Sequence, residues 1–169
     1  EAQHRCKDGR LIWGEVLAKP DYNLAGELIG YHGITREITQ RKQLQEQVKR
    51  LAFYDPLTHL PNRRLLEDRL SQAMSASQRS NRYGALLFLD LDNFKPLNDR
   101  HGHGVGDLLL IEVATRLKTC VREADTVARF GGDEVVVLLC DLDTDKAAAT
   151  TTAGSIAEKI RQSLSMPYW

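Results

Sequence analysis

The sequence RFGGDEV, at residues 129–135, decides how the second half of the chain is expected to fold. Runs of apolar and β-branched residues flank it on both sides, at 126–130 and 135–140. Glycine adopts positive φ angles without steric cost, so two adjacent glycines between strand-like runs predict a tight β-hairpin. The hairpin would carry two carboxylates, Asp133 and Glu134, at its tip.

A second acidic cluster ends another apolar run. Asp90 and Asp92 directly follow the strand-like residues 85–89. Acids at the ends of two strands suggest a Mg²⁺ site that receives a phosphate-bearing substrate, because oxygen ligands suit this ion. The alternative is ordinary turn chemistry with solvated carboxylates, and the hairpin considered by itself favours that alternative.

Residues 90–107 favour a binding site. The stretch is dense in acids, amides and glycines, and it lies between a strand of the buried type and an amphipathic helix. Such polar density at a strand-to-helix junction is costly unless it binds something. We expect Asp107 to begin the helix, where its charge also suits the helix dipole. The residues of that helix expected to face inward are Leu108, Leu109, Ile111, Val113, Ala114 and Leu117.

Composition limits the class of protein. The 169 residues are 42% hydrophobic and carry no net formal charge. This allows one domain plus part of another and argues against binding of a nucleic acid polymer. The cysteines Cys6, Cys120 and Cys140 lack metal-type spacing and predict reduced thiols in the cytoplasm. Because no apolar run is long enough to span a bilayer, we expect no membrane contact from this chain, and the parent protein can still be membrane-anchored.

Hydrophobic patterning separates an N-terminal region from the rest of the chain. Residues 1–39 predict β-strands separated by turn signals, too few to form a stable domain alone. Residues 40–54 predict a linker helix with Leu44, Val48 and Leu51 on one side. That side is either a seam of coiled-coil type or the inner face of a surface helix packed on its own domain.

Residues 55–169 predict an α+β domain of the α/β-sandwich type. The expected order after Arg63 is helix, strand, helix, two hairpin strands and helix, which is a βαββα core preceded by one helix. Residues 75–83 are expected to form a polar loop, and 85–91 is apolar enough to predict a central strand. The last helix is expected over 144–164, after which the core lacks a closing strand.

Several motifs in order resemble the GGDEF family, the diguanylate cyclases. They are the hairpin sequence, the pattern DxDxFKxxNDxxGHxxGD at 90–107, and DPLT followed by LPNR within 55–63. The resemblance covers residues 51–168 and implies a palm-like nucleotide-cyclase fold without its C-terminal strand and helix. A shorter resemblance, through KDG at 7–9 and GITREITQRK at 33–42, is to the C-terminal strands of a PAS sensor domain that runs into a signalling helix.

The GGDEF resemblance implies an enzyme that condenses two GTP molecules into cyclic di-GMP and releases pyrophosphate. Each protomer of a homodimer would hold one GTP, and the 3′-hydroxyl of one GTP would attack the α-phosphate of the other. The resemblance also implies two Mg²⁺ ions per active site, with Mn²⁺ as the alternative ion. Phosphoryl transfer depends on charge neutralisation and in-line positioning, which suits a site rich in carboxylates with one lysine.

The same resemblance assigns roles to single residues. Asp90, the carbonyl of Leu91 and Asp133 would ligate the metal. Asp133 would also assist deprotonation of the attacking hydroxyl, Glu134 would support the metals or the ligand, and Lys95 would offset the phosphate charge. Asp133, Lys95 and Glu134 are therefore the expected catalytic residues.

Two further groups of residues would recognise nucleotides. Asn98 and Asp107 would read the guanine edge, with His103 near the substrate, because a carboxylate acceptor suits the N1–H and N2–H₂ donors of guanine. For His103, a purely structural role, in which it packs or caps within the loop, is as well supported as a place near the substrate. Arg122 and Asp125 resemble the family's inhibitory product site, at which cyclic di-GMP would bind as an inhibitor. By spacing alone, such a pair is most often a surface ion pair.

Two departures from the family pattern affect the expected activity. The fifth hairpin position is Val135 instead of Phe, a smaller side chain at a position expected to pack. The family's C-terminal strand and phosphate-binding helix do not follow Trp169, so we expect an unpaired strand edge and little or no cyclic di-GMP from this chain alone. The rival hypothesis is a degenerate module that binds GTP or cyclic di-GMP and regulates a neighbouring domain. A single-nucleotide cyclase like the adenylyl cyclases is disfavoured by Asn98 and Asp107.

Overall fold

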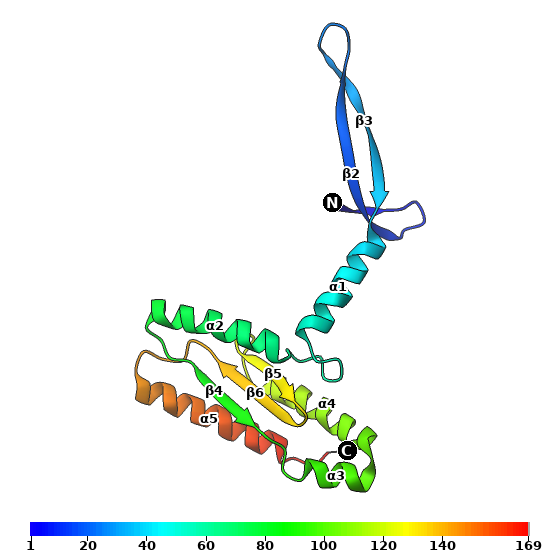
Figure 1. Cartoon of the computed structure of the whole chain (residues 1–169). Coiled ribbons are helices and arrows are strands. Elements are labelled where there is room, and N and C mark those ends of the chain that lie inside the picture. Colours follow the sequence, from blue (N-terminus) through cyan, green and yellow to red (C-terminus); the bar gives the residue numbers. More distant parts are fainter. Residues whose placement is uncertain (169) are drawn as a thin grey trace. The chain divides into compact units, whose positions relative to one another are not determined.

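The computed structural model describes residues 1–168, and residue 169 lies outside the described part (Figure 1). The chain divides into two compact units, Glu1–Arg50 and the part that begins at Leu51. The helix α1 (Thr39–Phe53) crosses this boundary, so its last residues belong to the second unit.

A three-stranded antiparallel sheet forms most of the first unit. Its strands, in the spatial order β1-β2-β3, are β1 (Ala2–Arg5), β2 (Leu11–Tyr22) and β3 (Leu28–Glu37). Gly9 and Gly26 take φ angles of +86° and +81° in the connecting turns, which confirms both predicted turns. Ile38 is only 3% exposed, whereas most side chains of β2 and β3 are exposed or half-buried. This sheet therefore contributes little hydrophobic core of its own.

The predicted hydrophobic seam of α1 is exposed. Leu44, Val48 and Leu51 are 54%, 66% and 73% exposed, and no residue of α1 is buried. Apolar side chains spaced four and then three residues apart gain stability only when a second surface covers them. The exposure therefore favours the coiled-coil interpretation of this helix.

The second unit is a three-layer α/β/α sandwich. Its elements along the chain are α2 (Arg63–Ser80), β4 (Ala85–Leu89), α3 (Phe94–His101), α4 (His103–Cys120), β5 (Thr126–Gly131), β6 (Glu134–Leu139) and α5 (Lys146–Leu164). The sheet is antiparallel with the order β4-β6-β5. Helix α2 covers one face of the sheet, and α4 and α5 cover the other (Figure 1). This arrangement confirms the predicted α+β class.

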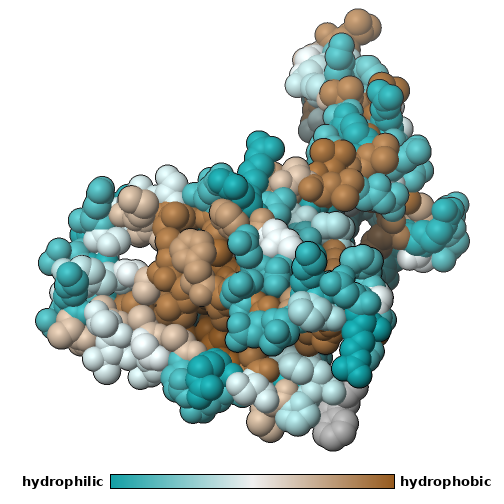
Figure 2. Space-filling view, turned by 60° about the horizontal axis from the view of Figure 1, so that its bottom comes forward, coloured by the Kyte–Doolittle hydropathy of each residue, from teal (hydrophilic) through white to brown (hydrophobic). Residues whose placement is uncertain are grey.

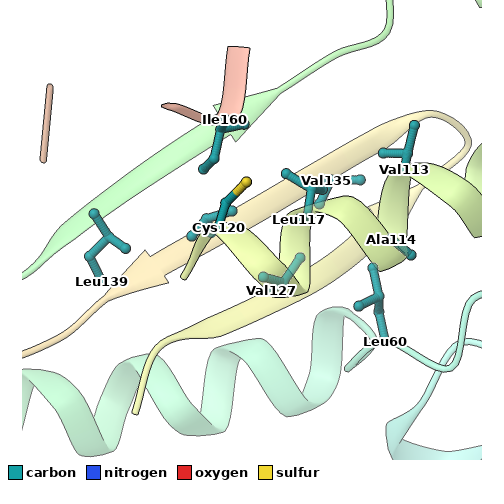
Figure 3. Close-up of a cluster of buried hydrophobic side chains, with 10 residues drawn as sticks. Leu60, Val113, Ala114, Leu117, Cys120, Val127, Val135, Leu139 and Ile160 are labelled. Carbon is teal, nitrogen blue, oxygen red and sulfur yellow. The ribbon is translucent and has the colours of Figure 1, made fainter. Parts of the chain in front are cut away.

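Two hydrophobic clusters fill the spaces between these layers, because successive side chains of a strand point to opposite faces. Val135 of β6 packs with Leu117 of α4 and Ile160 of α5 on one face (Figure 3). Val136 packs with Leu66 of α2 on the other face. Val135, which stands where the family pattern has Phe, is 3% exposed. This confirms the prediction that its side chain packs in the core.

The prediction that residues 85–91 form a central strand is wrong. In the described chain, β6 lies in the centre, and β4 is an edge strand paired with β6 alone. Leu86 and Phe88 are 39% and 74% exposed, so the apolar run is not covered on both faces. The arrangement confirms the predicted unpaired strand edge. Figure 2 shows that hydrophobic side chains gather on one face of this unit.

The remaining differences between the predicted and the observed structure concern the ends and the buried faces of the helices. The predicted polar loop at 75–83 is largely the end of α2, which stops where Asn81 takes a φ of +55°. Asp107 does not begin its helix, because α4 starts one turn earlier. Val113, Ala114 and Leu117 are at most 3% exposed, which confirms that they face inward. Leu108 and Ile111 are 67% and 40% exposed, so their predicted inward position is wrong, and Leu110, which was not predicted, is 3% exposed. No helix among residues 1–168 combines the length and apolar character needed to cross a bilayer.

Candidate functional site

The β5–β6 hairpin places two acids at one end of the second sheet. Gly131 pairs with Glu134, so Gly132 and Asp133 are the central residues of the turn. Gly132 takes a φ of +52°, which side chains rarely adopt, and this confirms the predicted glycine-dependent turn. Asp133 is half-buried and Glu134 is exposed.

The pairing of β4 with β6 brings Asp90 to the same end of the sheet. Leu89 pairs with Val135 at the end of β4, and Asp90 and Glu134 are the residues next to this last pair. Leu89 and Leu91 both pack against the cluster on the α4 and α5 face, and the alternation of a strand directs Asp90 to the α2 face. Val135 lies in the same cluster, which directs Glu134 to the α2 face as well. Asp90 and the hairpin acids therefore lie at the same end of the sheet.

The oxygen atoms at this sheet end suit a hard divalent cation. The Phe94 N–H donates to the Leu91 carbonyl at 3.3 Å, which leaves the second lone pair of that oxygen for a cation. Within the described residues, no group of three or more His, Cys, Asp and Glu side chains is arranged to hold a metal. The expected ligand set contains only two side chains, those of Asp90 and Asp133. Mg²⁺ is commonly held by one or two carboxylates together with the phosphates of its substrate, so the donors present fit this ion.

A groove of about 680 Å³ runs along β4 and includes Asp90 and Asp92 in its wall. Helices α4 and α5 form the opposite wall, with Leu109 and Arg161 among its residues. Asp133 is not one of the residues that line this groove. Asp90 and Asp133 therefore do not line this groove together.

Helices α3 and α4 carry the residues predicted to bind phosphate and guanine. Lys95 lies exposed in the first turn of α3, and Asn98 lies in the middle of that helix. His103 is the first residue of α4, and Asp107 is exposed one turn later. A Cβ atom built on Gly106 would lie 2.0 Å from Asn98 Oδ1, so the Asn98 amide rests on the backbone directly before Asp107. The structure thus packs Asn98 against the residue that precedes Asp107 in the sequence.

The Asn98 amide has an unusual environment. Its Oδ1 atom is buried and has no hydrogen-bond partner among the described residues. A buried acceptor without a partner is costly, so a ligand or an ordered water is expected to satisfy it. With Oδ1 turned toward Gly106, the hydrogen-bonding group that the amide offers to a ligand is its Nδ2 donor.

Arg122 and Asp125 form a tight turn at the other end of β5 from the acids. Asp125 accepts hydrogen bonds from the N–H of Arg122 at 3.0 Å and from the N–H of Cys140 at 3.1 Å. Its side chain is 9% exposed, whereas Arg122 is exposed. The Asp125 carboxylate therefore ties the start of β5 to the end of β6, and the Arg122 guanidinium is accessible to an anionic ligand.

A nearly buried ion pair beside the hairpin was not expected from the sequence. Arg129 Nη1 lies 3.1 and 3.2 Å from the two carboxylate oxygens of Asp55, and Arg129 Nε donates to the Gly132 carbonyl at 2.9 Å. Burial opposes ionisation of Asp55, but hydrogen bonds from Thr58 and the Arg129 guanidinium together outweigh it, so the pKa of Asp55 lies below its ordinary value. The sequence feature that could have predicted this ion pair is the position of Arg129 inside an otherwise apolar strand.

Comparison with known proteins agrees with this geometry. Residues 52–168 match the family described as "Diguanylate cyclase, GGDEF domain". The chain therefore belongs to the GGDEF family, which confirms the resemblance found in its motifs.

Relatives of the chain include characterised signalling proteins. The bifunctional diguanylate cyclase/cyclic di-GMP phosphodiesterase MucR of Pseudomonas aeruginosa is 47% identical over 130 residues, which cover 77% of this chain and 18% of MucR. The solved GGDEF domain of TpbB from P. aeruginosa is 44% identical, with a TM-score of 0.63 over 68% of this chain and 63% of that one. The coiled coil and GGDEF domain of DgcB from Caulobacter crescentus, solved in complex with c-di-GMP, is 28% identical, with a TM-score of 0.63 over 73% and 61% of the two chains. The chain thus spans less than a fifth of MucR.

Proposed function

We propose that the unit beginning at Leu51 is the catalytic domain of a diguanylate cyclase, which condenses two GTP molecules into cyclic di-GMP and pyrophosphate. The observation that carries this proposal is the pairing of Leu89 with Val135, because it supports a shared site for Asp90 and the hairpin acids. Membership of the GGDEF family and similarity to proteins described as diguanylate cyclases support it further.

The residues at the sheet end have the chemistry for phosphoryl transfer. Asp90, Asp133 and the Leu91 carbonyl would hold Mg²⁺, which neutralises phosphate charge when bound. Asp133 takes part in removing the proton from the attacking 3′-hydroxyl. Glu134, on the same face as Asp90, supports this set of ligands. Lys95 places a positive charge beside the phosphates from the first turn of α3.

Recognition of guanine follows from the contact between α3 and α4. Asn98 donates through Nδ2 to the O6 or N7 acceptors of guanine, and Asp107 accepts from its N1–H and N2–H₂ donors. Adenine has no N1–H donor and presents an amino group in place of O6, so this pair selects GTP over ATP. His103, at the start of α4, lies near the bound nucleotide in this arrangement.

Assembly and regulation are part of the same proposal. Because each protomer binds one GTP, catalysis requires a homodimer, and the exposed Leu44 and Val48 of α1 support pairing of this helix. Residues 1–39 are the C-terminal strands of a PAS sensor domain, and 40–54 form the signalling helix that passes its state to the cytoplasmic domain at 55–169. Cyclic di-GMP inhibits the enzyme by binding Arg122, whose turn is held by Asp125.

Turnover by the full-length natural protein tests the proposal. The purified protein is incubated with GTP and Mg²⁺, and cyclic di-GMP is quantified by chromatography. Asp133→Ala should lower the rate by about 10²-fold or more, while cyclic di-GMP still binds through Arg122. Asp68→Ala, which removes an exposed acid on α2, is the matched control and should leave the rate unchanged. Absence of turnover in the wild type, with product binding retained, would replace the cyclase by the degenerate binding module.

The 169-residue chain by itself should have much lower activity than the full-length protein. The outer edge of β4 is unpaired in the described residues, and Phe88 beside it is 74% exposed. An open hydrophobic edge favours association between chains over a stable, defined site. Size-exclusion chromatography together with the turnover assay checks this expectation, and a monodisperse chain with full activity would contradict it.

A further inference from the structure

Arg129 joins two segments that lie far apart in the sequence. Its Nη1 donates to both carboxylate oxygens of Asp55, and its Nε donates to the carbonyl of Gly132 at 2.9 Å. The Arg129 and Asp55 side chains are 15% and 17% exposed, so little water competes for the bonds between them, whereas the bond to Gly132 lies at the exposed turn. Hydrogen bonds between charged groups that are shielded in this way are stronger and more directional than neutral ones.

Asp55 is itself held firmly. Thr58 donates to Asp55 Oδ1 through its N–H at 2.8 Å and through its hydroxyl at 2.7 Å. The N–H of Asp55 donates to the carbonyl of Leu60 at 2.8 Å, and Leu60 is 1% exposed in the core. The guanidinium of Arg129 is therefore anchored to a rigid loop and not to a mobile surface side chain.

The carbonyl that Arg129 binds belongs to the peptide joining Gly132 to Asp133. Glycine permits a wide range of backbone angles, so the turn sequence alone does not fix the orientation of this peptide. The hydrogen bond from Arg129 Nε does fix it. Because this peptide leads directly into Asp133, its orientation sets the direction in which the Asp133 carboxylate leaves the turn.

The anchoring loop is also bonded to the last turn of α1. The N–H of Arg129 donates to the Pro61 carbonyl at 2.9 Å. The next residue, Asn62, donates to the Phe53 carbonyl at 2.9 Å through its N–H and to the Ala52 carbonyl at 3.0 Å through Nδ2. A continuous set of hydrogen bonds therefore runs from the end of α1 to the acidic turn.

We infer that Arg129, anchored by Asp55, is a positioning residue that holds the Gly132–Asp133 peptide in the orientation that the cyclase reaction needs. Its catalytic consequence rests on the proposed function. Arg129 acts through Asp133 and does not itself touch the substrate. Loss of such an outer partner of a metal ligand typically lowers metal affinity or activity by about 10–100-fold.

The substitution Arg129→Lys in the full-length protein tests this role. Lysine keeps the charge but lacks the planar fork that reaches Asp55 and Gly132 together. We expect kcat to fall by about 10–100-fold, the Mg²⁺ concentration for half-maximal rate to rise by about tenfold, and KM for GTP to change by less than about threefold. Asp55→Asn should act in the same direction with a smaller loss. Arg63→Lys, which changes an exposed guanidinium beside the same hairpin, is the matched control and should alter neither quantity.

Amide hydrogen exchange tests the same inference without catalysis. In Arg129→Lys, peptides that cover residues 126–139 should exchange faster at the turn, while those covering 85–89 should be unchanged. Wild-type values of kcat, Mg²⁺ dependence and exchange in the variant would overturn the inference and leave the proposed function standing. Faster exchange throughout the sheet would show a general structural role and would also overturn it. If the wild type lacks turnover, the proposed function fails, and the exchange result alone decides the inference.

Discussion

Replacing Gly106 by alanine should displace the amide that is proposed to read guanine. The new Cβ would lie 2.0 Å from Asn98 Oδ1, 2.9 Å from Asn98 Cγ and 3.1 Å from the Phe94 ring. Because ordinary contact begins at 3.4 Å, Oδ1 must retreat by about 1.4 Å. The Asn98 amide is the end of a flexible side chain, so it will rotate away before the helices separate.

The size of the effect follows from this displacement. A shift of this size exceeds the tolerance of hydrogen-bond geometry and breaks the bond from Asn98 to guanine. Losing one such bond costs about 1–2 kcal/mol of binding free energy, which is a weakening of about 5–30-fold. Alanine is favoured over glycine inside a helix by about 0.5–1 kcal/mol, which offsets part of the strain. The free energy of unfolding should therefore stay within about 1 kcal/mol of the wild type.

The assay compares two glycines of the same helix. KM for GTP and thermal unfolding are measured for Gly106→Ala and for Gly104→Ala in the full-length protein. A Cβ on Gly104 has nothing within 4 Å, so that variant should keep the wild-type KM. Unchanged KM in Gly106→Ala, or an equal rise in both variants, would refute the proposed contact between Asn98 and guanine.

Three further predictions concern the hairpin and its anchor. The lowered pKa of Asp55 means that its stabilising contribution is present above about pH 4 and is lost as the pH falls through the folded-state pKa. The difference in melting temperature between the wild type and Asp55→Asn should therefore shrink in that pH range. A difference that stays constant would contradict the prediction. Gly132→Ala should lower the free energy of unfolding by about 1–2 kcal/mol because φ at this residue is +52°. Gly131→Ala, which introduces no such strain, is the control. Equal effects of the two substitutions in urea denaturation would argue against a turn that depends on glycine. Val135→Ala should cost about 2 kcal/mol at a 3% exposed position, and a negligible loss in the same experiment would show that the side chain is not part of the core.

Local sequence patterns were sufficient for the hairpin and for its two strands. A Gly-Gly pair between β-branched runs requires a turn with positive φ, and Gly132 adopts it. The run at 135–139 is apolar at every position, which is typical of a strand buried on both faces, and Val135 and Val136 do lie in different clusters of the core. The acids of the candidate site could be selected because each follows or precedes a strand, and strand ends can be recognised in the sequence.

Features that depend on distant pairing were not accessible in this way. The apolar run of β4 indicates a strand but does not specify how many strands neighbour it. Helix α3 was not among the expected elements, although proline is tolerated in the first turn of a helix, as Pro96 is here, and α3 begins after Asn93 takes a φ of +61°. Arg129 and Asp55 are separated by 74 positions, and neither local sequence identifies the other as its partner.

The most direct measurement is the position of a bound divalent ion. The full-length protein is crystallised with Mn²⁺ and a non-hydrolysable GTP analogue, and anomalous diffraction locates the ion. We predict an ion within about 2.2 Å of carboxylate oxygens from both Asp90 and Asp133, beside the triphosphate. An ion held by only one of these residues, or bound elsewhere, would contradict a shared metal site at this end of the sheet.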